Sequence, residues 1–284
     1  MHRTALTLLA ALALAAPVRA QQPDRGDAKV THNRTVVVTA DWLAARLDSG
    51  NVVVVHVGRS DSAFRAGYIP GARFLPLSAV ATTVRGVPYE FANAAQLGAT
   101  FRDLGIGDSA RVVLYGDDPG LLAARTWTAL DILGHGARAS VLDGGLGRWR
   151  AGNRALETSV RPVTARPFTA RWRADRVVNA AWVRAHLQDR AVAFVDARPA
   201  DQYSGAVEPP CPPAAQECHL FPAGRRGHLP GAGNIYWMEQ LVASENNVFR
   251  TMHYLHEELW VPSGTDRAPV KTVVVYCANS FEIT

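Results

Sequence analysis

Short apolar runs alternate with segments of helical periodicity along most of this chain. In the first half, strands are predicted at 52–57, which is apolar apart from His56, at 112–115, which is apolar throughout, and at 140–142, where Val141 and Leu142 follow Ser140. The segments between them have the apolar spacing of amphipathic helices, predicted at 39–48, 92–104, 120–133 and 145–151. Strands that alternate with helices predict a parallel sheet covered on both faces, which agrees with continuous rather than alternating valines.

The second half repeats the same order of parts. A buried strand is predicted at 192–195 and another at 271–277, and the helices are predicted at 179–187 and 251–260. Each half also contains a Gly-x-hydrophobic-Pro-Gly-Ala turn, at 67–72 and 227–232. We therefore expect an α/β protein of two tandem domains, each a parallel sheet flanked by helices.

The repeat sets the expected domain boundaries. The first domain spans 35–156 and the second 177–284, and a proline-containing linker at 157–176 joins them. A short N-terminal segment at 21–34 precedes the first domain.

The first twenty residues have the composition of a signal peptide. Arg3 precedes the apolar run Ala5 to Ala16, and Val18, Arg19 and Ala20 end in a small residue. Twelve apolar residues are too few for a membrane-spanning helix, which needs about 20. We expect cleavage after Ala20 and a periplasmic or secreted protein that has no membrane contact afterwards; an uncleaved anchor is the alternative.

Composition and charge limit the classes of partner. The chain has 284 residues, 48% of them hydrophobic, which suffices for two domains of ordinary size. Lys29 and Lys271 are its only lysines, and the net charge of +5 comes from arginines that are spread along the chain. Without a basic run, the sequence argues against nucleic acid and is compatible with small anionic substrates.

Three cysteines have different settings. Cys211 and Cys218 lie in a proline-rich loop, where export favours a disulfide; a metal clip that includes His219 is the alternative. Cys277 follows the last predicted strand and is left without a sequence partner. Such a thiol is either a buried apolar residue or a reactive nucleophile.

Several motifs resemble the rhodanese family of sulfurtransferases. They are Asp196-x-Arg198, the turn at 227–232, and Val275-Tyr276-Cys277, in this order. Leu142-Asp143-Gly144-Gly145 with Trp149 is similar to the end of a rhodanese domain. In the first half, Gly116 stands at the cysteine position, and Val57 is expected at the position of the aspartate.

The resemblance implies a function and a set of site residues. Two tandem domains with a thiol only in the second are the arrangement of thiosulfate and 3-mercaptopyruvate sulfurtransferases. Cys277 would then carry a persulfide and pass its sulfur to cyanide or a thiol, without cofactor or metal. Arg198 would bind the anionic donor together with main-chain N–H groups of the following loop, and Asp196 would be structural. The loop residues are Ala278, Asn279, Ser280, Phe281 and Glu282.

The second copy differs from the first in ways that bear on activity. The first continues for 36 residues beyond Gly116 to Gly152, whereas seven follow Cys277, so we expect a truncated second domain whose last strand is partly open to water. Gln202 occupies a place where these enzymes commonly have a further arginine. A non-catalytic binding module or an inactive fragment is therefore the alternative function. A cysteine phosphatase is disfavoured, because Ile283 stands where such an enzyme needs arginine.

Overall fold

A computed structural model describes residues 36–84, 87–116, 118–208, 226–265 and 269–277. The loop 278–282 and the cysteines Cys211 and Cys218 lie outside the described residues.

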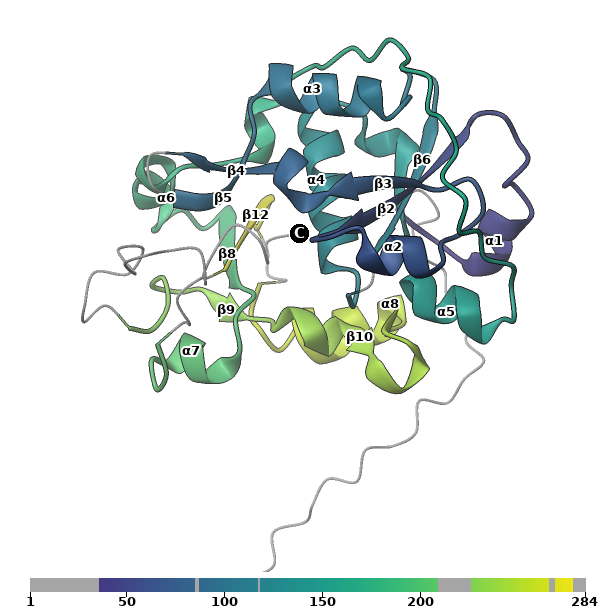
Figure 1. The fold of residues 1–284 in the computed structure, drawn as a ribbon. Coiled ribbons are helices and arrows are strands. Elements are labelled where there is room, and N and C mark those ends of the chain that lie inside the picture. The colour runs from purple at the N-terminus through teal and green to yellow at the C-terminus, as the bar shows by residue number, and fades with distance from the viewer. Residues whose placement is uncertain (1–35, 85–86, 117, 209–225, 266–268, 278–284) are drawn as a thin grey trace, which may run out of the picture. The chain divides into compact units, whose positions relative to one another are not determined.

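The first half contains a five-stranded parallel sheet (Figure 1). Its strand order is β1-β7-β6-β2-β3. The strands are β1 (Val37–Val38), β2 (Val52–Gly58), β3 (Arg73–Pro76), β6 (Arg111–Gly116) and β7 (Ala139–Leu142). The helices are α1 (Ala40–Ala44), α2 (Ser62–Ala66), α3 (Ala94–Asp103), α4 (Leu121–Ile132) and α5 (Gly145–Ala151), with 3-10 turns η1 (Leu77–Ala79) and η2 (Gly136–Arg138). The predicted fold class is confirmed.

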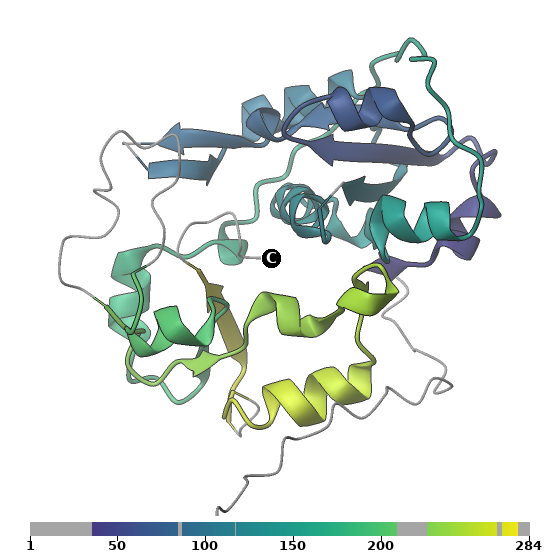
Figure 2. The same cartoon turned by 60° about the horizontal axis from the view of Figure 1, so that its bottom comes forward.

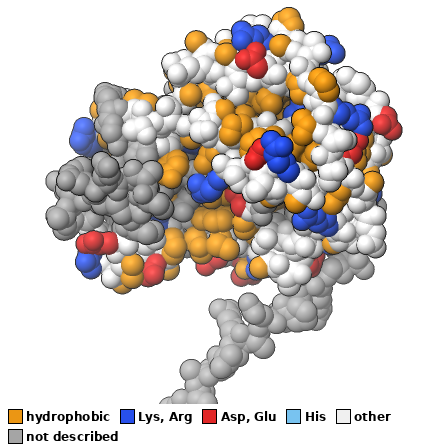
Figure 3. Space-filling view, viewed as in Figure 1, with side chains coloured by type: hydrophobic (Ala, Val, Ile, Leu, Met, Phe, Trp, Pro, Cys, Tyr) orange, Lys and Arg blue, Asp and Glu red, His pale blue; other side chains and the backbone are white. Residues whose placement is uncertain are grey.

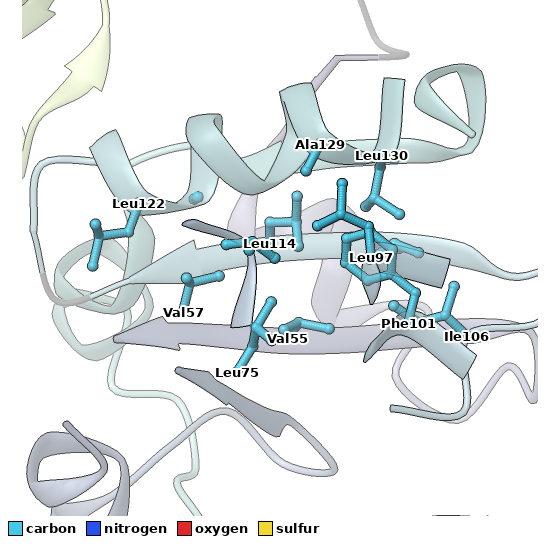
Figure 4. Close-up of a cluster of buried hydrophobic side chains, with 14 of the residues drawn as sticks. Val55, Val57, Leu75, Leu97, Phe101, Ile106, Leu114, Leu122, Ala129 and Leu130 are labelled. Atoms are coloured by element: carbon cyan, nitrogen blue, oxygen red, sulfur yellow. The ribbon is translucent and has the colours of Figure 1, made fainter. Parts of the chain in front are cut away.

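Each face of this sheet is covered by its own set of helices. Successive residues of a strand point to opposite faces, so Val112 and Leu114 pack in one cluster, and Val113 and Tyr115 in the other. Helices α3 and α4 close the first cluster, which Figure 4 shows, and α1, α2 and α5 close the second. All four of these β6 residues are fully buried. The continuous apolar run is thus explained by burial on both faces.

Side-chain caps define where two of the helices begin. The Asn93 side chain accepts the N–H of Gln96 at 2.9 Å, and the Gln96 side chain accepts the N–H of Asn93 at 3.3 Å, forming a capping box. Thr39 accepts the N–H of Trp42 at 3.1 Å. The predicted helix 39–48 is shorter in the structure, where α1 ends at Ala44.

The structure contains an antiparallel hairpin that the sequence pattern did not predict. It consists of β4 (Ala81–Val84) and β5 (Val87–Phe91), in a stretch for which no strand was predicted. Tyr89 has a φ of 61°, and its carbonyl accepts a hydrogen bond from Arg125 of α4. Burial lowers the pKa of Arg125 to about 10, and its guanidinium lies 3.5 Å from the centre of the Phe91 ring.

The segment predicted as a linker is bound to the first half along its length. Residues 157–173 form no helix or longer strand, and η3 (Ala174–Arg176) ends the segment. The Asp108 carboxylate accepts hydrogen bonds from the N–H and hydroxyl of Thr169, at 2.6 and 2.7 Å. Phe168 packs against His135, with ring centres 5.3 Å apart. This segment is therefore a strap on the first half.

The second half has a smaller parallel sheet of order β12-β8-β9. Strands β8 (Val192–Asp196) and β12 (Thr272–Tyr276) lie side by side in Figures 1 and 2 and pair over their whole length. The remaining elements are α6 (Ala180–His186), α7 (Ala200–Ser204), β9 (Gly233–Asn234), η4 (Trp237–Gln240), β10 (Leu241–Val242), η5 (Ala243–Glu245), β11 (Val248–Phe249), α8 (Met252–Tyr254) and the π-helical turn η6 (Leu255–Trp260).

Strand β12 is less buried than its counterpart β6. Among the described residues β12 pairs with β8 alone, whereas β6 lies between β2 and β7. Val273 is 43% exposed, while Val113 is fully buried. This exposure agrees with the expectation that the last strand is partly open to water.

Candidate active site

The register of the second sheet brings the two predicted site motifs to one edge. Tyr276 pairs with Asp196, and the N–H of Ala197 donates to the Tyr276 carbonyl at 2.9 Å. Because β8 and β12 are parallel, their carboxyl ends meet at the same edge of the sheet. Cys277, the next residue along, is thus brought to the loop that begins with Ala197 and Arg198. Cys277 is of intermediate burial.

Arg198 is held by a buried carboxylate. Asp196 is fully buried, and its two oxygens accept from Nε of Arg198 at 2.9 and 3.1 Å and from Nη2 at 2.5 Å. Nη2 also donates to the Gly227 carbonyl at 2.7 Å, so the pair fixes the 227–232 turn to the end of β8. Asp196 thus orients the Arg198 side chain.

The Arg198 guanidinium is electrostatically coupled to Cys277. Its hydrogen bonds with Asp196 raise the pKa of Arg198, burial opposes this, and the negative charges of Asp196 and of an ionised Cys277 add to the increase. By the same interaction, the guanidinium cation favours the thiolate form of Cys277. Within the described ranges, the hydrogen bonds of this guanidinium are made by Nε and Nη2.

Two residues that the sequence analysis did not assign complete the arrangement. The Tyr276 hydroxyl accepts the Leu229 N–H at 2.9 Å, and burial raises the pKa of this phenol. Asn234 of β9 donates through Nδ2 to the carbonyls of Asp196 and Arg198, at 2.9 and 2.8 Å. Tyr276 therefore holds the 227–232 turn, and Asn234 fixes the loop that carries Arg198.

The first half contains the same framework without the charged groups. Tyr115 of β6 pairs with His56, and its hydroxyl accepts the Ile69 N–H at 3.1 Å, just as Tyr276 accepts that of Leu229. By this register His56, not Val57, occupies the aspartate position, so the predicted alignment was wrong by one residue. Gly58 then corresponds to Arg198.

At the cysteine position of the first half, the chain leaves little space for a side chain. A Cβ on Gly116 would lie 3.0 Å from the Val57 carbonyl and 3.1 Å from the Asp118 carboxylate. Asp118 itself accepts the N–H groups of Gly120 and Leu122 at the start of α4, at 3.1 and 3.0 Å. The Asp118 carboxylate thus accepts the N–H groups at the start of α4 that would otherwise be available to an anion.

Two further polar side chains of the second half, those of His228 and Arg226, have local partners. His228 stacks on Tyr203 with ring centres 3.8 Å apart, and its Nδ1 lies 2.9 Å from the Tyr203 carbonyl oxygen. Arg226 pairs with Glu208 at the surface. Gln202 has a buried Oε1 with no hydrogen-bond partner in the part of the chain that the structure describes.

The described residues contain neither a metal-ligand cluster nor a membrane-spanning helix. No three His, Cys, Asp or Glu side chains there lie close enough to hold a metal ion. No described helix has both the length and the apolarity that a bilayer span requires.

Comparison with known proteins agrees with the internal repeat. The sequence profile described as Rhodanese-like domain matches residues 39–152 and again 179–282, which together are most of the chain. The chain belongs to the rhodanese family. The two matched segments carry the two versions of the framework, with Gly116 in one and Cys277 in the other.

Relatives within the rhodanese family are named as sulfurtransferases. A Pseudomonas aeruginosa protein, provisionally named a 3-mercaptopyruvate sulfurtransferase, is 31% identical over 258 residues, 86% of this chain and 84% of its own. A Mycobacterium leprae protein, provisionally named a thiosulfate sulfurtransferase, is 29% identical over 250 residues, 85% of this chain and 82% of its own.

A solved structure supports the fold. The crystal structure of SseA from Escherichia coli, described with a rhodanese fold, has a TM-score of 0.70 and 24% identity, and the match covers 88% of this chain and 90% of SseA. At this identity the likeness shows that the described arrangement is the rhodanese fold.

Proposed function

We propose that this chain transfers sulfane sulfur from a small anionic donor to a thiol or cyanide through a persulfide on Cys277. The observation that carries the proposal is the position of Cys277 directly after β12, at the carboxyl edge of the parallel sheet where Asp196 at the end of β8 orients a buried Arg198. The relatives suggest thiosulfate or 3-mercaptopyruvate as the donor.

Arg198 supplies the positive charge that this chemistry needs. An ordinary cysteine has a pKa of about 8.5 and is mostly protonated at neutral pH, whereas the thiolate is the nucleophile. A nearby guanidinium favours the thiolate and also attracts an anionic donor. In the proposal, main-chain N–H groups of Ala278 to Glu282 give additional stabilisation to the sulfur.

With thiosulfate, the Cys277 thiolate attacks the outer sulfur. A bond forms between Sγ and this sulfur, the sulfur–sulfur bond of thiosulfate breaks, and sulfite leaves with the electron pair. With 3-mercaptopyruvate, the carbon–sulfur bond breaks instead, and the resulting enolate takes the thiol proton to give pyruvate. Cyanide or a thiolate then attacks the terminal sulfur of the persulfide and regenerates the Cys277 thiolate.

The first half acts as a scaffold in this proposal. It has glycine at the cysteine position and lacks the aspartate and arginine, because His56 and Gly58 stand in their places. Its tyrosine-to-turn hydrogen bond is retained, which supports a structural role for this half.

We further propose that the mature chain acts in the periplasm or outside the cell after cleavage behind Ala20. The basic start at Arg3 and the apolar run that follows support export. The proposed partners are small. On the face shown in Figure 3, positive and negative side chains are interspersed, which supports small anions over nucleic acid.

The proposal is tested by incubating the reduced full chain with thiosulfate, removing the excess and recording the intact mass. We expect a gain of about 32 Da, one sulfur atom, that cyanide reverses with release of thiocyanate. Cys277→Ser should abolish the gain, and the double variant Cys211→Ser, Cys218→Ser is the matched control that should retain it. If neither thiosulfate nor 3-mercaptopyruvate gives the gain, the chain is a binding module.

A further inference from the structure

The hairpin of β10 and β11 in the second half packs on the first half. Both belong to one compact unit, residues 31–284. The N–H of Phe249 in β11 donates to a carboxylate oxygen of Asp143 at 2.8 Å. Asp143 is buried directly after β7, and the Phe249 side chain packs against the apolar cluster that α3 and α4 close. The hairpin is therefore attached to the first half by a hydrogen bond to a buried carboxylate and by an aromatic ring.

The motif at 142–145, at the end of β7, leaves room for this hairpin. Gly144 has a φ of 68°, and a Cβ there would lie 3.0 Å from Cγ1 of Val248. A Cβ on Gly147 would lie 3.2 Å from the side-chain oxygen of Asn246, at the tip of the hairpin. Both distances are shorter than ordinary contacts of a Cβ. Glycine at these two positions thus permits the close approach of the two segments.

The same part of the chain reaches the loop that follows β8. Residues 234–250, called the bridging segment here, run from that loop to the end of the hairpin. The N–H of Trp237 donates to the Ala197 carbonyl at 3.3 Å, and the N–H of Ala197 donates to the Tyr276 carbonyl at 2.9 Å. Ala197 therefore connects the bridging segment with the end of the strand that Cys277 follows.

Hydrogen bonds within the bridging segment make a compact path between its two ends. The N–H of Arg250 donates to the Gln240 carbonyl at 2.9 Å, and its Nε donates to the Glu239 carbonyl at 2.8 Å. The N–H of Asn247 donates to the Val242 carbonyl at 3.0 Å, in addition to the pairing of β10 with β11. A displacement of the hairpin is therefore transmitted to η4 and the loop beyond it.

We infer that Asp143 is a positioning residue for the Cys277 site: it anchors the bridging segment to the first half, and this segment holds the loop that carries Arg198. The inference deepens the proposed function and rests on it for its biological meaning. It also gives the first half, which has Gly116 at the cysteine position, a part in the activity.

Asp143→Ala removes the acceptor of the Phe249 N–H, and hydrogen–deuterium exchange of the full chain measures the result. A hydrogen bond to a charged group corresponds to about a 10- to 100-fold change in an equilibrium constant, so exchange at Phe249 should accelerate by about this factor. Acceleration of at least about threefold should also appear at Trp237, which contacts the loop of Arg198. The matched control is Asp108→Ala, which removes a carboxylate acceptor of a main-chain N–H on the strap and should leave both sites unchanged.

The exchange experiment has clear contrary outcomes. Unchanged exchange at Phe249 in Asp143→Ala overturns the inference, and so does acceleration that is confined to the hairpin or is equal in Asp108→Ala. Asp143→Asn keeps an acceptor oxygen and should restore most of the protection; failure of this rescue in a folded chain counts against the inference. If the Asp143→Ala chain does not fold, Phe249→Ala releases the same contact from the second half and is read in the same way.

Activity is tested with the double variant Asp143→Ala, Phe249→Ala, because loss of the hydrogen bond and of the ring should together weaken docking of the hairpin about a thousandfold. Undocking leaves a smaller fraction of chains with Arg198 in place, so the apparent affinity for an anionic donor falls by that fraction. We expect the thiosulfate concentration at half-maximal persulfide formation to rise about tenfold or more, while the rate at saturation changes by less than about twofold. The control Asp108→Ala, Phe168→Ala removes an acceptor and a ring that packs against the same apolar cluster, and it should load like wild type.

Persulfide formation is read after trypsin cleavage behind Lys271, on the peptide that begins at Thr272 and contains Cys277. Hydrogen exchange needs no sulfur donor, so the two proposals fail separately. A wild-type chain that takes up no sulfur would refute sulfur transfer, and the exchange results would still decide the positioning. Sulfur uptake with the same half-maximal concentration in wild type and in the double variant would refute the positioning alone.

Discussion

Asp196→Asn changes a single buried charge and leaves the side-chain volume almost unaltered. The Asp196 side chain is 0% exposed to solvent, and the Arg198 side chain that it binds is 8% exposed. Asparagine keeps one acceptor oxygen, but its NH2 group faces a guanidinium that can only donate. The arginine is then buried with its charge uncompensated.

The expected loss is large compared with the stability of a domain. Removing one partner of a buried ion pair costs about 3 to 5 kcal/mol, and we take about 3 because one acceptor remains. Typical domains are stable by about 5 to 15 kcal/mol. For a chain of this size, about 3 kcal/mol corresponds to a decrease of roughly 6 to 12 °C in the melting temperature.

The assay is thermal unfolding followed by circular dichroism, together with urea unfolding followed by tryptophan fluorescence. Asp61→Asn is the matched control, because it removes a carboxylate that pairs with Arg65 at 2.6 Å while both side chains are exposed. An exposed pair contributes about 0 to 1 kcal/mol, so the control should melt close to wild type. If Asp196→Asn and Asp61→Asn melt together at the wild-type temperature, the buried pair does not hold this edge of the second half.

Two further predictions concern the first half. Burial lowers the pKa of His135, whose ring lies between the Ala110 carbonyl, at 3.0 Å, and Phe168 of the strap, with Asp108 and Arg138 as charged neighbours. Because the folded pKa lies below the unfolded value of about 6.5, the stability that His135 contributes is present above pH 6.5 and is lost as the pH falls through the folded pKa. Urea midpoints should therefore fall between about pH 7 and 5, and less so in His135→Asn. Asn93→Ala removes the capping box of α3 and should destabilise the first half by about 1 kcal/mol in urea unfolding, while an unchanged midpoint would show that the cap is dispensable.

Local sequence patterns predicted those elements whose stability has local causes. Runs of mostly apolar residues identified β2, β6 and β8, because strands covered on both faces need few polar positions. The predicted helix 145–151 coincides with α5. The hairpin β4–β5 was missed, although the β-branched run Thr82, Thr83, Val84 was a usable signal.

The site was predicted as a set of motifs rather than as an arrangement. Asp196, Arg198 and Cys277 are visible in the sequence, but the bond from Leu229 to Tyr276 joins residues 47 positions apart. Asn234 reaches carbonyls 36 and 38 positions away. Such contacts depend on the register of parallel strands, which no local periodicity reports. The same register moved the aspartate position of the first half from Val57 to His56.

The account depends on sulfur passing through Cys277 beside Arg198, and isotope transfer tests this most directly. Thiosulfate with a heavy isotope in its outer sulfur is added to the reduced chain, part of the sample is digested, and the rest is treated with cyanide. We predict heavy sulfur on the peptide that begins at Thr272 and then in thiocyanate, with both signals reduced in Arg198→Gln. Label on the peptides of Cys211 or Cys218 instead, or heavy thiocyanate formed equally by Cys277→Ser, would contradict the account.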